Sequence, residues 1–387
     1  MHNYLLSEIA DVIDCEHKTA PIVTSSEFYS IRTTDIKNGV IHFDQANRVS
    51  NETYKKWTQR GIPEAGDIIL AREAPVGEVG WINNGYKACL GQRTVLIKVI
   101  HKEVNGRYLL YYLTNPSMKY ELQELSGGSV VPHLNMSDIR ALSLIIPPLP
   151  EQKAIASVLS SLDDKIDLLH RQNKTLEAIA ETLFRQWFIE EAEVLGEQVT
   201  LDNYLDTISD THKFQKGKAI FLNTSDIYKG NILHHNFTYK HQLPGQAKKS
   251  IKNGDILFSE IRPANGRWAF INFDAEDYVV STKLMVLRAK NITEAAFMYF
   301  YLTNSHTVRW LQMLAESRSG TFPQITFNQI RDLKINMASQ KRFDSVKKWC
   351  HIALEKIHHN FVQINTIELI RDTLLPKLIS GEVRVKI

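Results

Sequence analysis

Two long segments of the chain carry a regular alternation of apolar and polar positions. Residues 151–190 contain neither proline nor glycine, and their apolar side chains recur at alternating steps of four and three residues. A segment close to the C-terminus, up to Gly381, repeats this spacing. The spacing aligns the apolar side chains on one helix face and predicts two coiled-coil seams. The apolar seam positions are Ile155, Leu159, Leu162, Ile166, Leu169, Leu176, Leu183, Ile357, Ile364, Ile367, Leu374 and Leu378, and the same pattern includes Asn173 and Asn360.

The two seams predict that the helices pair with each other. Forty helical residues extend roughly 60 Å, and each buried seam side chain contributes about 1.5 to 3 kcal/mol that it would lose in water. An antiparallel pair within the chain buries both seams without a partner. On the pattern alone, the alternative that both segments are core helices of one larger domain stays open.

The remaining sequence has the pattern of mixed α/β units. Short β-branched runs such as 67–71 and 94–100 alternate with Asn-Gly turn signals, and helical stretches begin near Tyr108 and Ala295. The alternation is too irregular for a doubly wound parallel sheet. We therefore expect an α/β (mixed α+β) fold.

The chain also resembles itself at a spacing of about 190 residues. Five blocks recur in the same order with offsets between 188 and 191 residues. They are 34–36 and 225–227, 66–70 and 254–258, 111–115 and 300–304, 129–134 and 320–325, and 151–153 and 339–341. The repeat predicts two similar domains, 1–146 and 196–338, each followed by a helical region, 147–195 and 339–387.

Composition supports two folded domains and says little about partners. The 387 residues suffice for two cores, and the net charge is only +3. Lysine and arginine exceed acidic residues by 15 to 9 between residues 210 and 320, but number 15 against 16 in residues 1–150. The three distant cysteines fit buried thiols in a reducing cytosol. No signal-peptide or membrane-spanning pattern is visible, so we expect a cytoplasmic protein with no membrane partner.

Catalytic motifs are absent from the sequence. Neither an adenine-methyltransferase motif, a dinucleotide fingerprint nor a Walker A loop occurs. Asp255, Glu260 and Arg262 are the nearest approach to a nuclease metal site, but their spacing is too tight, and we interpret them as strand and loop residues. We expect no catalytic residue, metal or cofactor in this chain, which disfavours a stand-alone enzyme.

Two stretches resemble a known family. The run Pro147 to Leu159, with the sequence PPLPEQKAIASVL, and the following Leu162 to Ile166 are similar to the central conserved region of Type I restriction-modification specificity subunits. Residues 373–382 resemble the distal conserved region, and the repeat extends the resemblance over most of the chain. The second unit departs from the pattern, with Met337-Ala338-Ser339 where the first has the proline run.

The resemblance implies a non-catalytic DNA-binding subunit with two target-recognition domains, each reading half of a bipartite, asymmetric double-stranded sequence. It also implies two modification subunits docked on the helices, joined by restriction subunits, with S-adenosylmethionine, ATP and Mg²⁺ bound by those partners. A methylation-only assembly remains an alternative. Two units reading one face of B-DNA need a separation of about 34 Å or a multiple of it, which helices of roughly 60 Å can provide.

Residues that read DNA need polar side chains on loops that reach the bases or phosphates. Arg72 and Arg262 are the preferred candidates, because each follows a predicted buried strand in a loop with proline and glycine. For any single candidate an ordinary surface role is equally compatible with the sequence. The candidates are His17, Lys18, Thr19, Arg72, Gln92, Arg93, His133 and Asn135 in the first unit, and Lys213, Lys216, Arg262, Arg267, Lys283, Arg318, Thr321 and Gln324 in the second.

The end of the first helix is the predicted docking surface for a modification subunit. Phe184, Trp187 and Phe188 are too apolar for a solvent-exposed helix end, so we expect a partner to cover them.

Overall fold

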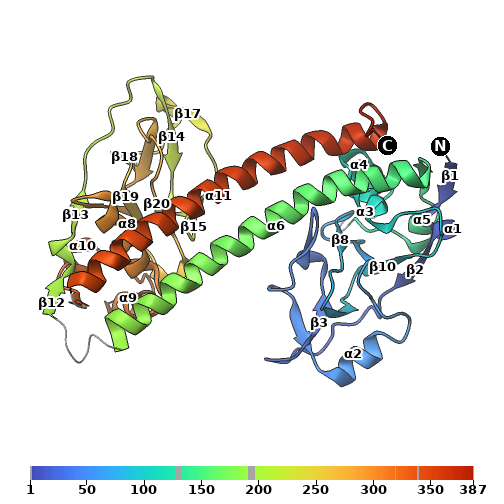
Figure 1. Cartoon of the computed structure of the whole chain (residues 1–387), viewed down its shortest axis with the longest axis horizontal. Helices are drawn as coiled ribbons and strands as arrows, with labels where there is room; N and C mark the ends of the chain where they lie inside the picture. The colour runs from blue at the N-terminus through green and yellow to red at the C-terminus, as the bar shows by residue number, and fades with distance from the viewer. Residues whose placement is uncertain (1, 128–131, 191–196, 319, 338–339, 387) are drawn as a thin grey trace. The chain divides into compact units, whose positions relative to one another are not determined.

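The chain forms two compact units. The computed structural model describes residues 2–127, 132–190, 197–318, 320–337 and 340–386. Unit 1 consists of Met1–Asp167 with Asn365–Ile387, and unit 2 of Leu168–Ile364. Each unit contains an α/β body and a stretch of both long helices, so the contacts divide the chain differently from the linear boundaries predicted above (Figure 1). None of the described helices is long and apolar enough to cross a membrane.

The two predicted long helices are present. Helix α6 spans Leu149–Arg185 and continues as a π-helical turn over Gln186–Glu190, and helix α11 spans Gln340–Ser380. Helix α6 begins earlier than expected, because Pro150 lies in its first turn, where a missing N–H leaves no hydrogen bond unmade. The predicted seam residues are buried or half-buried along both helices.

Within each unit the two helices run antiparallel. In unit 2, Asn360 Nδ2 donates to Asn173 Oδ1 at 2.7 Å, and further along the first helix the Phe188 ring lies 6.4 Å from the Phe343 ring of α11. In unit 1, Arg371 Nη1 donates to Asp163 Oδ1 at 3.1 Å, and Leu159 and Leu375 share one buried core. The residue number falls along α11 as it rises along α6, which is the order of an antiparallel pair. The burial of the seams agrees with the predicted coiled-coil pairing.

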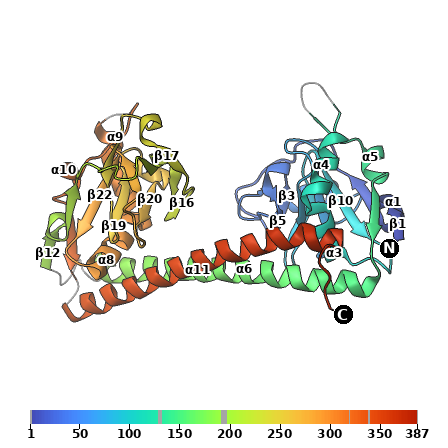
Figure 2. The same ribbon diagram turned by 90° about the horizontal axis from the view of Figure 1, so that it is seen from above.

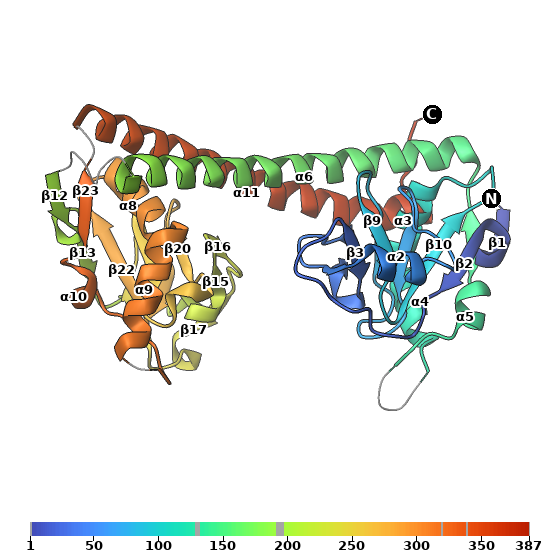
Figure 3. The same cartoon turned by 90° about the horizontal axis from the view of Figure 1, so that it is seen from below.

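Unit 1 is built around one six-stranded sheet. Its order is β2 (Ala10–Asp14), β10 (Thr94–Val99), β7 (Ile68–Ala71), β8 (Val79–Trp81), β5 (Gly39–Ile41) and β4 (Ile36–Lys37). The smaller sheets are β6 (Asn47–Val49), β3 (Phe28–Ile31) and β9 (Lys87–Leu90), and the pair β1 (His2–Leu5) and β11 (Ser143–Ile146). The helices are α1 (Leu6–Ile9), α2 (Asn51–Trp57), α3 (Gly106–Thr114), α4 (Pro116–Glu124) and α5 (Met136–Arg140). Helix α3 packs on β8 and also contacts α6, where Tyr111 donates to Asp163 at 2.5 Å (Figure 3).

Unit 2 contains two four-stranded sheets. One has the order β13 (Leu205–Ile208), β22 (Leu284–Ala289), β19 (Asp255–Ser259) and β20 (Trp268–Phe270), and the other β17 (Phe237–Tyr239), β14 (Lys218–Leu222), β21 (Tyr278–Ser281) and β18 (Ala247–Ser250). Two short pairs are β12 (Glu197–Thr200) with β23 (Lys334–Met337), and β15 (Ile227–Tyr228) with β16 (Asn231–Ile232). Helix α8 (Ile292–Thr303) packs on the first sheet and is followed by α9 (Ser305–Arg318) and α10 (Phe327–Ile330) (Figure 2).

The strand topology confirms the internal repeat and the mixed α/β fold. The antiparallel order β2-β10-β7-β8 matches β13-β22-β19-β20, and the parallel pair β3 with β9 matches β14 with β21. The terminal pair β1 with β11 likewise matches β12 with β23. Parts of the fourth and fifth repeat blocks, residues 129–131 and Ser339, lie outside the described residues.

The repeated Gly-Asp-Ile block has a structural explanation. Gly66 and Gly254 have φ of 99° and 89°, a left-handed conformation that glycine adopts without strain. The next residues, Asp67 and Asp255, each accept a hydrogen bond at 2.8 Å from the backbone N–H three residues earlier. Each carboxylate also pairs with a cation on the neighbouring strand, Lys98 at 2.9 Å and Arg288 at 2.7 Å.

The ion pair in unit 2 also argues against the weak metal-site alternative. The hydrogen bond to Asp255 raises the pKa of the Arg288 guanidinium, and the Asp255 side chain is fully buried. A carboxylate held by two N–H groups of one guanidinium, at 2.7 and 2.8 Å, has little capacity left for a metal ion.

The expected exposure of the end of α6 is wrong. Phe184 and Phe188 are almost fully buried in the core of unit 2, and both pack against Phe297 of α8 with ring centroids 5.1 Å apart. Trp187 is half-buried against the same core. These side chains are apolar because they complete a domain core of the chain itself, so their composition no longer argues for a docking partner.

Candidate nucleic-acid interface

Three loops of unit 1 meet beyond the end of strand β7. The N–H of Arg72 donates to the Arg93 carbonyl at 3.0 Å, and the N–H of Leu134 donates to the Arg72 carbonyl at 3.0 Å. Glu73 forms a β-bridge with His133. We call residues 72–77, 91–93 and 132–135 the first loop cluster. It gathers candidates that are far apart in the sequence.

Unit 2 has an equivalent arrangement beyond strand β19. The N–H of Glu260 donates to the Lys283 carbonyl at 3.0 Å, and the N–H of Ile325 donates to the Glu260 carbonyl at 2.8 Å. Ile261 forms a β-bridge with Gln324. We call residues 260–266, 281–283 and 321–325 the second loop cluster. It brings together the candidates Arg262, Lys283, Thr321 and Gln324 on the same backbone framework as the first cluster.

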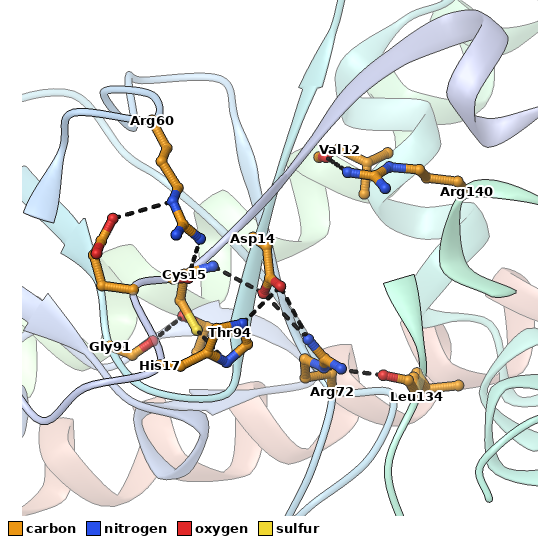
Figure 4. Close-up of polar contacts among 11 residues, drawn as sticks. Val12, Asp14, Cys15, His17, Arg60, Arg72, Gly91, Thr94, Leu134 and Arg140 are labelled. Atoms are coloured by element: carbon orange, nitrogen blue, oxygen red, sulfur yellow. Dashed lines mark hydrogen bonds and ion pairs between the residues drawn. The ribbon is translucent and has the colours of Figure 1, made fainter. Parts of the chain in front are cut away.

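Arg72 does not project from its loop as its surroundings in the sequence suggested. Its Nε donates to the Leu134 carbonyl at 2.9 Å, and its Nη1 lies 3.2 and 3.3 Å from the two carboxylate oxygens of Asp14 (Figure 4). The side chain is only 15% exposed. Arg72 therefore ties the end of β2 and the 132–135 segment to β7, and its Nε and Nη1 donors are committed to the protein.

Arg267 is also committed internally. Its Nη1 donates to the carbonyls of Ser225 at 3.1 Å and Ile227 at 3.0 Å, and its guanidinium lies 5.5 Å from the centre of the Tyr228 ring. This arginine holds the start of β15 beside β20. A role in reading bases would require it to break these contacts.

The remaining candidates of unit 1 lie on or beside the first loop cluster. His17, Lys18 and Thr19 form an exposed segment after β2, and His17 Nε2 contacts Asp14 Oδ2 at 2.8 Å. Thr19 and Gln92 approach through their side chains at 3.4 Å. Arg93 is half exposed and pairs with Glu73 at 2.9 Å, while exposed Asn135 donates to Asp138 at 3.0 Å.

Three candidates of unit 2 lie elsewhere or cannot be placed. Lys213 and Lys216 line a cavity of about 1000 Å³ that contains none of the residues of the second loop cluster. Lys216 pairs with Asp277 at 2.8 Å, and that hydrogen bond raises the lysine pKa. The side chain of Arg318 lies outside the described residues.

Strained backbone marks both clusters. Non-glycine residues with positive φ include His17 at 53°, Ala74 at 44°, Arg93 at 71° and Arg262 at 43°. Each such conformation costs of the order of 1 to 3 kcal/mol and persists where the surrounding structure enforces it, often at functional sites. The two others among the described residues, Asn38 and Lys229, precede the glycines of the repeated turns at Gly39 and Gly230.

Sequence reasoning missed Asp14, Glu73 and Ala74, whose importance comes from contacts made after folding.

Asp14, Cys15 and His17 are the described residues with donor atoms close enough together to consider a metal ion. The Asp14 carboxylate, however, accepts the Cys15 N–H at 2.9 Å and contacts His17 and the Arg72 guanidinium. The two ring nitrogens of His17 face different neighbours, Nε2 facing Asp14 and Nδ1 lying 3.9 Å from Cys15 Sγ. A guanidinium beside the carboxylate opposes a second cation there, so the group fits a hydrogen-bonded anchor better than a metal site.

Comparison with known proteins agrees with this architecture. The profile of the family described as the Type I restriction modification DNA specificity domain matches residues 2–178 and 203–341. The chain is 43% identical over 158 residues to the Type I restriction enzyme HindI specificity subunit of Haemophilus influenzae, covering 40% of this chain and 34% of that protein. It is 25% identical over 414 aligned positions to the MjaIX specificity subunit of Methanocaldococcus jannaschii, covering 98% and 94%.

A solved structure supports the fold over nearly the whole chain. The S subunit of a Type I restriction-modification system from M. genitalium matches with a TM-score of 0.60 at 16% identity, covering 97% of this chain and 95% of that one. The family profile matches two segments that include the two α/β bodies and their loop clusters. The chain belongs to the family of Type I restriction-modification DNA specificity subunits, the non-catalytic recognition components of such systems.

Proposed function

We propose that this chain recognises a bipartite, asymmetric double-stranded DNA sequence, with each loop cluster reading one half. The observation that carries the proposal is that both clusters share one backbone framework but display different side chains. A shared framework presents side chains in the same way, and different side chains select different bases. Two such surfaces in one chain fit a target with two unlike halves.

The exposed or half-buried side chains of each cluster suit direct readout. Unit 1 offers Gln92, Arg93 and His133, and unit 2 offers Arg262 and Gln324. Arginine and glutamine form paired hydrogen bonds with guanine and adenine in the major groove, each worth about 1 to 3 kcal/mol of discrimination. Lysines such as Lys18 and Lys283 suit phosphate contacts, which add affinity without sequence preference.

The paired helices support a scaffolding role. We propose that they set the distance between the recognition units and bind two modification subunits, with restriction subunits completing the assembly. S-adenosylmethionine, ATP and Mg²⁺ would then be held by those partners. Exposed apolar residues such as Leu168 and Ile179 on α6 and Ile352 and Leu369 on α11 suit a docking surface better than the buried Phe184 and Phe188.

The test is to express the chain with its modification subunits and map the methylated sequences. Replacing Arg93 and His133 by alanine is expected to change the bases required in one half of the motif. Replacing Lys283 and Gln324 is expected to weaken or relax only the other half. The exposed Lys102 and Lys290 lie outside the clusters, and their alanine variants serve as matched controls. A change in both halves from either pair would contradict separate reading.

A second measurement separates the alternatives of function. The purified chain alone is expected to show neither methyltransferase nor nuclease activity, and activity at stoichiometric rates would favour a stand-alone enzyme. Co-purification of restriction subunits, and their genes beside this one, distinguishes a restriction system from a methylation-only assembly.

A further inference from the structure

Residue 74 in unit 1 and residue 262 in unit 2 occupy equivalent places. Ala74 lies three residues after Ala71, the last residue of the buried strand β7. Arg262 lies three residues after Ser259, the last residue of the matching strand β19. Each directly follows the residue that forms the β-bridge to the third loop, Glu73 to His133 and Ile261 to Gln324. The equivalence therefore rests on backbone contacts and is independent of the side chains.

The backbone at both places has nearly the same positive φ, although the Ala74-Pro75 peptide bond is cis and the Arg262-Pro263 bond is not. Ala74 and Arg262 have φ of 44° and 43°, and each precedes a proline, Pro75 and Pro263. A residue before proline avoids the helical region, and a left-handed non-glycine residue is strained. Both residues are exposed. Each cluster thus holds one exposed residue with a left-handed φ directly before a proline.

The side chains at the two places differ in what they can do. Arg262 forms no ion pair with any carboxylate among the described residues, and its Nη2 reaches only the Thr321 carbonyl at 3.4 Å. By contrast, Nε and Nη1 of Arg72 and Nη1 of Arg267 contact acceptors of the protein at 2.9 to 3.3 Å. Arg262 can therefore turn its fork of donors to a ligand at little cost, whereas Ala74 has no donor.

We propose that this left-handed position before proline determines specificity in each cluster. Through it Arg262 reads a guanine of the second half-site, and Ala74 leaves the corresponding base pair of the first half-site unread. A fixed backbone reduces the ordering cost of the contact, and the guanidinium fork matches the O6 and N7 acceptors of guanine. The inference rests on the proposed function and names the position within each loop cluster on which base specificity depends.

The experiment uses the full chain assembled with its modification subunits and a library of targets randomised in both halves. Arg262→Ala is expected to reduce guanine preference at one position of the second half by roughly 5- to 150-fold, leaving the first half unchanged. Arg262→Lys keeps the charge but not the fork, so it should weaken this preference while retaining affinity at low salt. Ala74→Arg should create a guanine preference at one formerly unread position of the first half.

Matched controls decide between readout and charge. Ala74→Lys adds a charge at the same place without the planar fork, so any guanine preference it creates should be weaker than that of Ala74→Arg. Thermal unfolding of every variant identifies any that fail to fold. If Ala74→Arg does not fold, the Arg262 variants still test the proposal. The proposal would be overturned if Arg262→Ala left the base preference unchanged, or if it lost affinity equally for all targets, which would indicate a phosphate contact. A folded Ala74→Arg complex with no new base preference would also overturn the proposal. If the unaltered complex methylates no bipartite motif, the proposed function itself fails.

Discussion

A buried asparagine pair on the helix seam gives a prediction whose size can be worked out. Asn360 Nδ2 donates to Asn173 Oδ1 at 2.7 Å and also approaches Gln172 Oε1 at 3.4 Å. Asn173 Nδ2 and Asn360 Oδ1 are buried and have no hydrogen-bond partner among the described residues. The pair therefore makes one good hydrogen bond and leaves two polar groups desolvated.

The balance of these terms predicts how leucine substitutions act. A single Asn360→Leu change removes the hydrogen bond and leaves the whole Asn173 carboxamide unpaired, which should destabilise unit 2 by about 1 to 3 kcal/mol. Changing both residues to leucine loses about 1 kcal/mol of hydrogen bonding but relieves two unpaired groups at about 1 to 3 kcal/mol each. The double variant should therefore be more stable than the natural chain, by about 1 to 5 kcal/mol.

Urea unfolding of the natural chain, both single variants and the double variant measures this directly. The expected result is a coupling free energy of at least about 2 kcal/mol, with the double variant more stable than either single variant. Additive effects of the two substitutions would refute the reasoning, because they would show that the side chains do not interact. If the pair fixes helix register at a cost in stability, as buried asparagines do in coiled coils, methylation by the stabilised double variant should tolerate changed spacing between the half-sites.

Three further predictions follow from single sites. Phe188→Ala should cost about 3 to 5 kcal/mol in thermal or urea unfolding, because its ring lies in the core of unit 2, whereas Leu369→Ala, at a residue 69% exposed, should change stability by less than about 0.5 kcal/mol. Burial raises the pKa of Cys89 from 9.0 to about 11, so iodoacetamide at pH 8 should label it only after unfolding. The stability linked to that thiol is fully present below pH 9 and lost as the pH rises through 11, which unfolding at a series of pH values measures. Asp255→Asn should destabilise unit 2 by about 2 kcal/mol, because it weakens the pair with Arg288. Asp67→Asn should destabilise unit 1 by less, because its partner Lys98 also pairs with Glu64, and an equal effect of the two substitutions would contradict this order.

The long helices and the repeat could be predicted from sequence because both are periodic. The seam spacing places Leu159 and Ile364 on buried helix faces whatever they pack against, and the structure buries both. The repeated Gly-Asp pair is local too, since Gly66 turns the chain and Asp67 accepts a hydrogen bond from three residues away. Signals that act over a few residues survive in a single sequence.

The side-chain partners of the site could not be predicted, because they come from distant residues. Arg72 bonds Asp14 and Leu134, which are 58 and 62 residues away. Phe188 packs on Phe297 of α8, and the sequence around Phe188 does not predict that contact. In both cases the local pattern indicates only an arginine in a loop or an aromatic helix end. The tertiary contact then gave each residue a different role.

The position next to the strand end shows why the framework is visible in the sequence while the base code is not. Arg72 of unit 1 corresponds to Glu260 of unit 2, yet the N–H and carbonyl of both residues make the same hydrogen bonds to the second and third loops. Backbone bonds do not depend on which side chain the residue carries, so the framework tolerates even a reversal of charge. The repeated blocks preserve the glycines, aspartates and apolar residues that build the framework, and the positions that face outward are free to differ. For that reason two arginines in similar sequence surroundings, Arg72 and Arg262, have opposite roles: the first is locked into the framework, and the second is left exposed at a position that the framework holds fixed.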